Sequence, residues 1–323
     1  MSVAFVFPGQ GSQYVGMGAA LAERSQPAAA CFEEADAALD VPITRSAWDG
    51  PAEELDLTIN AQPSLLATSI AYLRALEEAV ARDGTSVLEP AVHAGHSMGQ
   101  YSAMVAAGVF DLADGMRLVR ERGRLMQASS EGGAMAAIIG LADSRLTDVI
   151  AAGESSGIVT IANRNSPGQV VISGDRMAVE RASEAARELG AKRAIVLPVS
   201  VAAHSPLMAS AADGMRRALA SVTFRDPTTP LLANADARPL TTGEVCPEEL
   251  IEHLTRGVDW VRAVETMVAA GVTAFVEVGP GKVLTGLIRR IAPDVAAFAL
   301  DDPGAPGRLA VPELAPVTSA SPV

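Results

Sequence analysis

A G-x-S-x-G motif formed by Gly95, Ser97 and Gly99 constrains the fold of this chain more than any other feature. An apolar run precedes the motif and a helical pattern follows it, which is the order strand, sharp turn, helix. The glycines let the two backbones approach where a side chain would clash, and the turn exposes the Ser97 hydroxyl. The N–H of Met98, at the helix start, would point at an oxyanion. The motif therefore predicts acyl transfer through a serine ester.

Composition limits the kind of protein and its surroundings. The chain has 323 residues, of which 49% are hydrophobic, enough for one large core or two unequal ones. A formal net charge of −13 argues against binding to nucleic acid or to anionic membranes. No apolar stretch reaches membrane-spanning length, the N-terminus lacks a signal-peptide pattern, and Cys31 and Cys246 lack metal-ligand spacing. We expect a cytoplasmic protein without a metal site.

Strand and helix patterns alternate along the chain, which predicts an α/β fold. Within it, one segment has the β-α-β-β-α-β order of a ferredoxin-like unit. Its strands are expected at 134–141, 159–163, 169–173 and 193–199, and its helices at 144–152 and 176–189. We therefore predict an α/β-hydrolase-like large subdomain, 1–130 and 199–300, with a ferredoxin-like small subdomain, 131–198, inserted. Pro, Ala and Ser dominate 301–323, which predicts a disordered tail.

The large subdomain has its own strand and helix signals. Pro63 suits the start of a long helix at 62–81. The remaining strands are expected at 3–7, 231–234 and 274–278. The remaining helices are expected at 112–129, 206–220 and 283–291, with two helical segments within 247–270.

A serine nucleophile needs a base, and the chain has four histidines: His93, His96, His204 and His253. His204 follows a predicted strand and precedes a helix, and such loops at the carboxyl edge of a sheet carry catalytic groups in α/β folds. The two histidines nearest Ser97 in sequence lie in the entering strand and beside the serine, where their rings should not reach its hydroxyl. His204 is therefore the predicted general base for Ser97.

Three further groups are less determined by the residues alone. The base could be oriented by Asp213, by Asp236 or by a backbone carbonyl. A second oxyanion donor is expected from the glycine-containing loop at 7–13, which follows the first strand. A cation for an anionic substrate is available on one helix, but its four arginines cannot all face one site: Arg117, Arg120, Arg122 and Arg124.

These motifs together resemble the malonyl-CoA:acyl carrier protein transacylases and the related acyltransferase domains of polyketide synthases. The resemblance extends from about residue 4 to residue 290. It is carried, in order along the chain, by 5–13 (F-V-F-P-G-Q-G-S-Q), 61–66, 95–99 (G-H-S-M-G), 122–127, 163–174, 204–208 (H-S-P-L-M) and 277–284.

The resemblance implies a role for each site residue. Ser97 would be the acylated nucleophile and His204 the base, oriented by a main-chain carbonyl at a position near His253. The oxyanion hole would consist of the N–H groups of Gln10 and Met98. Arg122 would bind the free carboxylate of a malonyl group. The other expected substrate-binding residues are Gln62, His96, Asn163 and Ala203, and the small Ala203 leaves the choice between malonyl and methylmalonyl open.

The resemblance implies transfer of malonyl from coenzyme A to the phosphopantetheine thiol of acyl carrier protein, by a ping-pong acyl-serine mechanism of fatty acid synthesis, without a cofactor. We expect a monomer whose partners are malonyl-CoA and acyl carrier protein. A discrete acyltransferase of a polyketide synthase is a close alternative. A serine thioesterase or hydrolase is disfavoured by Arg122 and by the lack of an evident triad acid. A non-catalytic scaffold is disfavoured by the intact Ser97 and His204.

Overall fold

A computed structural model describes residues 2–39, 41–83, 89–129, 132–197, 199 and 201–310. It contains two sheets, the larger with strand order β11-β10-β1-β2-β7-β8. Its strands are β1 (Val3–Phe7), β2 (Val92–Gly95), β7 (Leu231–Leu232), β8 (Pro239–Leu240), β10 (Ala274–Glu277) and β11 (Ala296–Ala299). All of its neighbouring strands whose register is known pair in parallel, except β7 with β8, which pair antiparallel.

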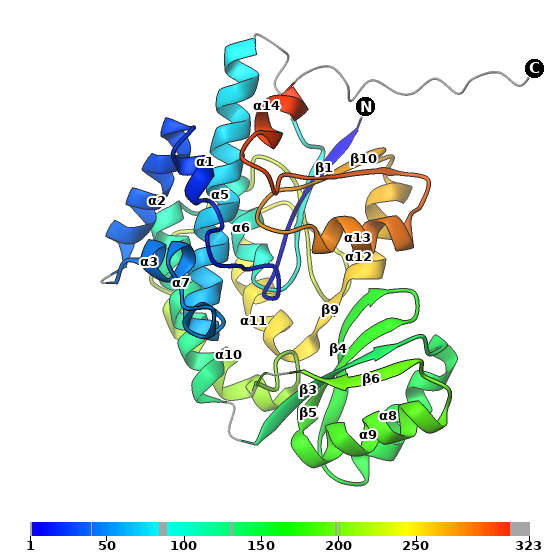
Figure 1. Ribbon diagram of the computed structural model, residues 1–323. Coiled ribbons are helices and arrows are strands. Elements are labelled where there is room, and N and C mark those ends of the chain that lie inside the picture. The colour runs from blue at the N-terminus through cyan, green and yellow to red at the C-terminus, as the bar shows by residue number, and fades with distance from the viewer. Residues whose placement is uncertain are drawn as a thin grey trace, which may run out of the picture.

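Helices cover both faces of the large sheet (Figure 1). Alternate residues of β1 therefore enter different cores: Phe5 and Phe7 pack with α2 and α5, whereas Ala4 and Val6 pack with α12 and α13. The helices of this unit are α1 (Ala19–Ala22), α2 (Gln26–Ala38), α3 (Ile43–Trp48), α4 (Ala52–Leu55), α5 (Thr58–Asp83), α6 (Gly99–Ala106), α7 (Leu112–Ala128), α10 (Ala209–Leu219), α11 (Cys246–Arg256), α12 (Trp260–Ala269), α13 (Val283–Ile291) and α14 (Ala305–Ala310).

The second sheet forms the small unit at the bottom of Figure 1, with both its helices on one face. Its elements are β3 (Gly133–Ile139), α8 (Leu146–Glu154), β4 (Val159–Ser166), β5 (Gln169–Asp175), α9 (Arg176–Glu188) and β6 (Arg193–Val196). The strand order β6-β3-β5-β4 with antiparallel pairing is that of a ferredoxin-like sheet. The predicted order of elements is therefore confirmed, while residues 130, 131 and 198, at the predicted boundaries, lie outside the described residues.

One strand that joins the two units was not predicted. β9 (Val258–Asp259) pairs in parallel with β4 and extends the small sheet to five strands. Its two residues lie between α11 and α12, where the sequence predicts only helical segments at 247–270. A two-residue strand has no periodicity to read, so the sequence carries no signal for it.

Helix α5 begins at Thr58, earlier than the helix predicted at 62–81, so Pro63 lies inside the helix rather than at its start. A proline there removes the hydrogen bond to the carbonyl four residues earlier. Arg120 of α7 replaces it, because its Nη1 donates to the carbonyl oxygen of Ile59 at 2.9 Å. The neighbouring turn of α7 can approach because Gly123 has no side chain: a Cβ there would lie 2.7 Å from the Ile59 Cα.

The prediction of a disordered tail at 301–323 is wrong for its first part. Ala305–Ala310 forms α14, which packs against α5, and Ala305 is buried. Burial against a helix distant in sequence compensates for the weak helix preference of this segment. Residues 311–323 lie outside the described residues. None of the helices that the structure describes is both long and apolar enough to span a bilayer.

Candidate active site

The G-x-S-x-G motif forms the predicted sharp turn. β2 ends at Gly95, Ser97 has a φ of 53°, and α6 begins at Gly99. Both glycines are required by packing, since a Cβ on Gly95 would lie 2.0 Å from the Gly99 carbonyl carbon and one on Gly99 would lie 2.2 Å from the Phe7 carbonyl oxygen. A left-handed φ is costly for a serine, and such strain is typical of functional turns.

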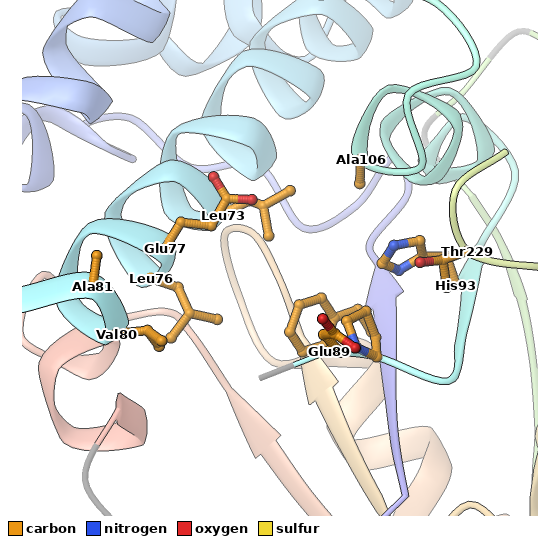
Figure 2. Close-up of a pocket in the computed structure, with 11 residues that line it drawn as sticks. Leu73, Leu76, Glu77, Val80, Ala81, Glu89, His93, Ala106 and Thr229 are labelled. Carbon is orange, nitrogen blue, oxygen red and sulfur yellow. The ribbon is translucent and has the colours of Figure 1, made fainter. Parts of the chain in front are cut away.

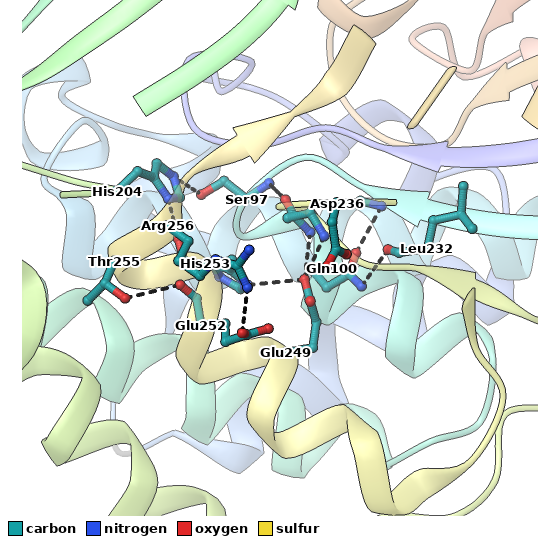
Figure 3. A network of polar contacts seen from close by, with 12 residues as sticks. Ser97, Gln100, His204, Leu232, Asp236, Glu249, Glu252, His253, Thr255 and Arg256 are labelled. Carbon is teal, nitrogen blue, oxygen red and sulfur yellow. Dashed lines mark hydrogen bonds and ion pairs between the residues drawn. The ribbon is translucent and has the colours of Figure 1, made fainter. Parts of the chain in front are cut away.

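The structure brings Ser97 and His204 together although 107 positions separate them. His204 Nε2 lies 2.9 Å from Ser97 Oγ, and His204 Nδ1 is hydrogen-bonded to the main-chain carbonyl of His253 in α11 (Figure 3). A carbonyl only accepts, so Nδ1 carries the proton and Nε2 is free to accept one from Ser97. Neither candidate acid orients the base: Asp213 pairs with Arg216, and Asp236 pairs with Arg238.

The environment keeps His204 neutral. Burial, and then the nearby positive charge of Arg122, hold the pKa of His204 well below its usual value. Its backbone φ is 61°, so base and nucleophile both occupy the left-handed region. A neutral imidazole in a fixed orientation is the form that a general base requires.

Arg122 is the arginine of α7 that faces Ser97. It is 1% exposed, and its guanidinium donates to Gln62 Oε1 at 2.9 Å and lies 3.1 Å from Ser97 Oγ and 3.2 Å from His253 Nε2. No acidic side chain forms an ion pair with it in the part of the chain that the structure describes. The other three arginines are occupied elsewhere: Arg117 by Asp114, Arg120 by Ile59 and Asn60, and Arg124 by Glu121.

Two main-chain N–H groups in the segments that meet at this turn have no partner among the described residues. They belong to Met98, at the N-terminus of α6, and to Gln10, in the loop after β1. This loop lies against the turn, because a Cβ on Gly9 would lie 2.5 Å from the His96 carbonyl oxygen. Free N–H groups close to a nucleophile can stabilise an oxyanion.

Comparison with known proteins places this geometry in a family. Residues 4–298 match the family model described as "Acyl transferase domain". The chain belongs to this acyl transferase family. The malonyl CoA-acyl carrier protein transacylase of Escherichia coli (strain K12) is 48% identical over 304 residues, which cover 94% of this chain and 96% of that protein. The protein of the same name from Bacillus subtilis (strain 168) is 43% identical over 306 residues, covering 93% and 94%.

Solved acyl transferase structures show the same fold. The crystal structure of acyl-carrier-protein S-malonyltransferase from Bartonella henselae superposes with a TM-score of 0.91 at 43% identity, covering 96% of this chain and 99% of that one. A malonyl-transacylase in complex with its type II polyketide synthase acyl-carrier protein gives a TM-score of 0.90 at 41% identity, with coverages of 96% and 99%. These findings confirm the resemblance and the two-subdomain α/β fold class predicted from the sequence.

The other predicted substrate-binding residues of this acyl transferase differ in how they relate to Ser97 and His204. His96 Nε2 lies 2.9 Å from Asn165 Oδ1, and its ring packs near Trp260. Ala203 is buried directly before His204. Asn163 is buried on β4, and no hydrogen bond joins its side chain to another described residue of the site. Asn165, rather than Asn163, is the β4 residue that contacts the serine turn through His96.

Sequence reasoning missed two buried residues that support the turn, Asn234 and Glu249, of which Figure 3 labels Glu249. Asn234 Oδ1 accepts a hydrogen bond from the Ser97 N–H at 2.8 Å. Glu249 Oε1 in turn accepts from the Asn234 main-chain N–H at 2.7 Å and lies 3.3 Å from its Nδ2. Burial raises the pKa of Glu249 to about 7. Asn234 ends the strand predicted at 231–234, so its position at the carboxyl edge of the sheet could have indicated a site residue. No sequence pattern indicates Glu249.

A hollow that is separate from the site lies at the other end of β2. It is a cavity of about 340 Å³ between α5 and the sheet, lined by Leu73, Leu76 and Val80 of α5 and by His93 (Figure 2). His93 contacts the rings of Phe5 and Phe7, and no contact joins it to Ser97 in the described structure. As expected, His93 is not placed to serve as the base.

Proposed function

We propose that this protein transfers a malonyl group from coenzyme A to the phosphopantetheine thiol of acyl carrier protein through a malonyl-Ser97 ester, as part of fatty acid synthesis. The observation that carries the proposal is the buried Arg122, 3.1 Å from Ser97 Oγ and without an acidic partner among the described residues. A buried guanidinium without a counter-ion is unfavourable, and a carboxylated acyl group would supply that counter-ion. The names of the relatives agree with this substrate.

In the first half-reaction, Ser97 Oγ attacks the thioester carbonyl carbon while His204 Nε2 takes the hydroxyl proton. The negative charge that develops on the carbonyl oxygen is stabilised by the N–H groups of Met98 and Gln10, each worth roughly 3 kcal/mol. The carbon–sulfur bond then breaks, and the departing sulfur of coenzyme A takes the proton from His204. The malonyl group is left as an ester on Ser97.

The second half-reaction reverses these roles. His204 takes the proton of the phosphopantetheine thiol, and the sulfur attacks the ester carbonyl. The carbon–oxygen bond to Ser97 breaks, and Ser97 Oγ recovers its proton from His204. Oxidation states do not change, and the only prosthetic group involved arrives on the partner protein, so the protein needs no cofactor of its own.

Arg122 explains why malonyl would be preferred to acetyl. Its planar guanidinium can form two charge-assisted hydrogen bonds to the free carboxylate. An acetyl group leaves that cation unpaired, which disfavours its transfer. Gln62 holds the guanidinium, and His96, Ala203 and Asn163 are assigned to the surrounding pocket.

Radiolabelled malonyl-CoA tests the proposal against its alternatives. We expect one equivalent of label on Ser97, absent in Ser97→Ala, that moves to phosphopantetheinylated acyl carrier protein when this is added. Release of free malonate faster than transfer to the carrier would instead identify a hydrolase. Absence of label from the wild-type protein would identify a non-catalytic binding protein, and either result would overturn the proposal.

A further inference from the structure

Among the described residues, the groups that hold the cation at the centre of the site are all neutral. The guanidinium of Arg122 contacts Gln62 Oε1, Ser97 Oγ and His253 Nε2, and lies over the Tyr101 ring with 5.8 Å from its Cζ to the ring centroid. A guanidinium only donates hydrogen bonds, so each nitrogen or oxygen that binds it must present a lone pair. The orientation of the Arg122 guanidinium therefore depends on side chains that can accept hydrogen bonds.

His253 meets this requirement with one specific tautomer. Its Nε2 lies 3.2 Å from Arg122 Nη2, so the lone pair must be on Nε2 and the proton on Nδ1. Nδ1 faces the buried carboxylate of Glu249, 3.8 Å from Oε1, which favours a proton on that side of the ring. Burial, and then the charge of Arg122, hold the pKa of His253 well below its usual value, so the accepting form is the stable one.

His253 also orients the base His204, but through its main chain rather than its side chain. The main-chain carbonyl of His253 accepts from His204 Nδ1. Any residue at this position would supply that carbonyl, whereas only a side chain with a suitable acceptor could hold Arg122. The main chain and the side chain of His253 can therefore be tested separately by substitution.

We propose that the imidazole of His253 is a positioning residue that aims Arg122 at the substrate carboxylate and so sets the preference for a carboxylated acyl group. The inference rests on the proposed function. It predicts that loss of the imidazole raises KM for malonyl-CoA more than it lowers kcat, because the carbonyl that orients His204 stays in place.

The test compares His253→Leu, which cannot accept a hydrogen bond, with His253→Gln, whose amide oxygen can. We expect His253→Leu to raise KM for malonyl-CoA about tenfold, the scale of one hydrogen bond to a charged group, and to reduce the malonyl-to-acetyl preference similarly. His253→Gln should restore both values to within about twofold of the wild type. The matched control is His93→Gln, which replaces a buried imidazole outside the site.

His253→Met, an unbranched apolar variant, replaces His253→Leu if thermal unfolding shows that the leucine variant does not fold. An unchanged KM and an unchanged malonyl-to-acetyl ratio in the folded apolar variant would overturn the inference. Equal losses in His253→Leu and His253→Gln would overturn it as well, since they would indicate packing alone. The proposed function fails separately, when the wild-type protein takes no label from malonyl-CoA on Ser97.

Discussion

A buried histidine lies near each end of β2: His93 belongs to the strand itself, and His204 reaches its carboxyl end from a distant loop. At the amino end, His93 lies beside a largely apolar cavity that Glu77 and Glu89 also line, and its Nδ1 has no hydrogen-bond partner among the described residues. At the carboxyl end, both ring nitrogens of His204 are engaged, one by Ser97 and one by the His253 carbonyl. Burial lowers the pKa of both histidines. Burial therefore keeps an imidazole neutral, whereas hydrogen bonds to both ring nitrogens also fix its orientation.

The difference follows from the direction of the strands. In a parallel sheet the carboxyl ends of neighbouring strands share one edge, and the following helices begin there. The Ser97 turn, the loop after β1 and Asn234 after β7 all lie at that edge. The N-terminus of α6 adds a favourable field for negative charge. Three changes test this contrast, in order of decreasing effect on activity.

Ser97→Ala has the largest expected effect. It removes the atom that carries the acyl group, so malonyl transfer should fall by at least about 10⁴-fold. Transfer of labelled malonyl to the carrier protein, measured together with the thermal midpoint, checks the result. Transfer at more than a few per cent of the wild-type rate in the folded variant would contradict an ester mechanism.

Arg122→Ala should be less damaging and selective. It removes the counter-ion of the substrate carboxylate, so kcat/KM for malonyl-CoA should fall about 10²-fold, while kcat/KM for acetyl-CoA falls much less. Steady-state kinetics with both thioesters measures the two values. Arg117→Ala, an exposed arginine of the same helix paired with Asp114, is the control and should remain within about twofold. Equal losses for both substrates would argue against charge recognition.

His93→Gln should have the smallest effect on activity, within about twofold, because His93 lies outside the site. Its effect should appear in stability at low pH. Burial lowers the pKa of His93 from 6.5 to about 4. Between these values the unfolded chain binds the proton and the folded protein does not, so stability falls as the pH falls. His93 should therefore lower the free energy of unfolding by about 2 kcal/mol when the pH falls from 7 to 5.

Urea unfolding at the two pH values measures this cost. The glutamine variant should lose about 2 kcal/mol less stability than the wild type on going to pH 5. The same pH dependence in both proteins would show that His93 is not the group responsible.

The parts of this protein that could be predicted from sequence have local signals. The order of elements in the small unit follows from hydrophobic periodicity and turn residues, and His204 follows from its place between a strand and a helix. The inclusion of Pro63 in α5 could not be predicted, because the Ile59 carbonyl that Pro63 leaves without a donor is satisfied by Arg120 of another helix. The two residues of β9 and the helix α14 likewise depend on partners distant in the chain.

The sequence by itself determined the turn at Ser97, because its two glycines and the following helix act within a few residues. The residues of α7 by themselves did not select an arginine; the family resemblance pointed to Arg122, and the tertiary structure places it in the site. Helical periodicity distributes four arginines around the axis, and only the packing of α7 against α5 selects Arg122 for burial beside Gln62. It also decided that the His253 carbonyl, rather than an aspartate, orients the base. Every residue has a carbonyl, so residue types alone could not assign that role, and only the family resemblance pointed to a carbonyl near His253.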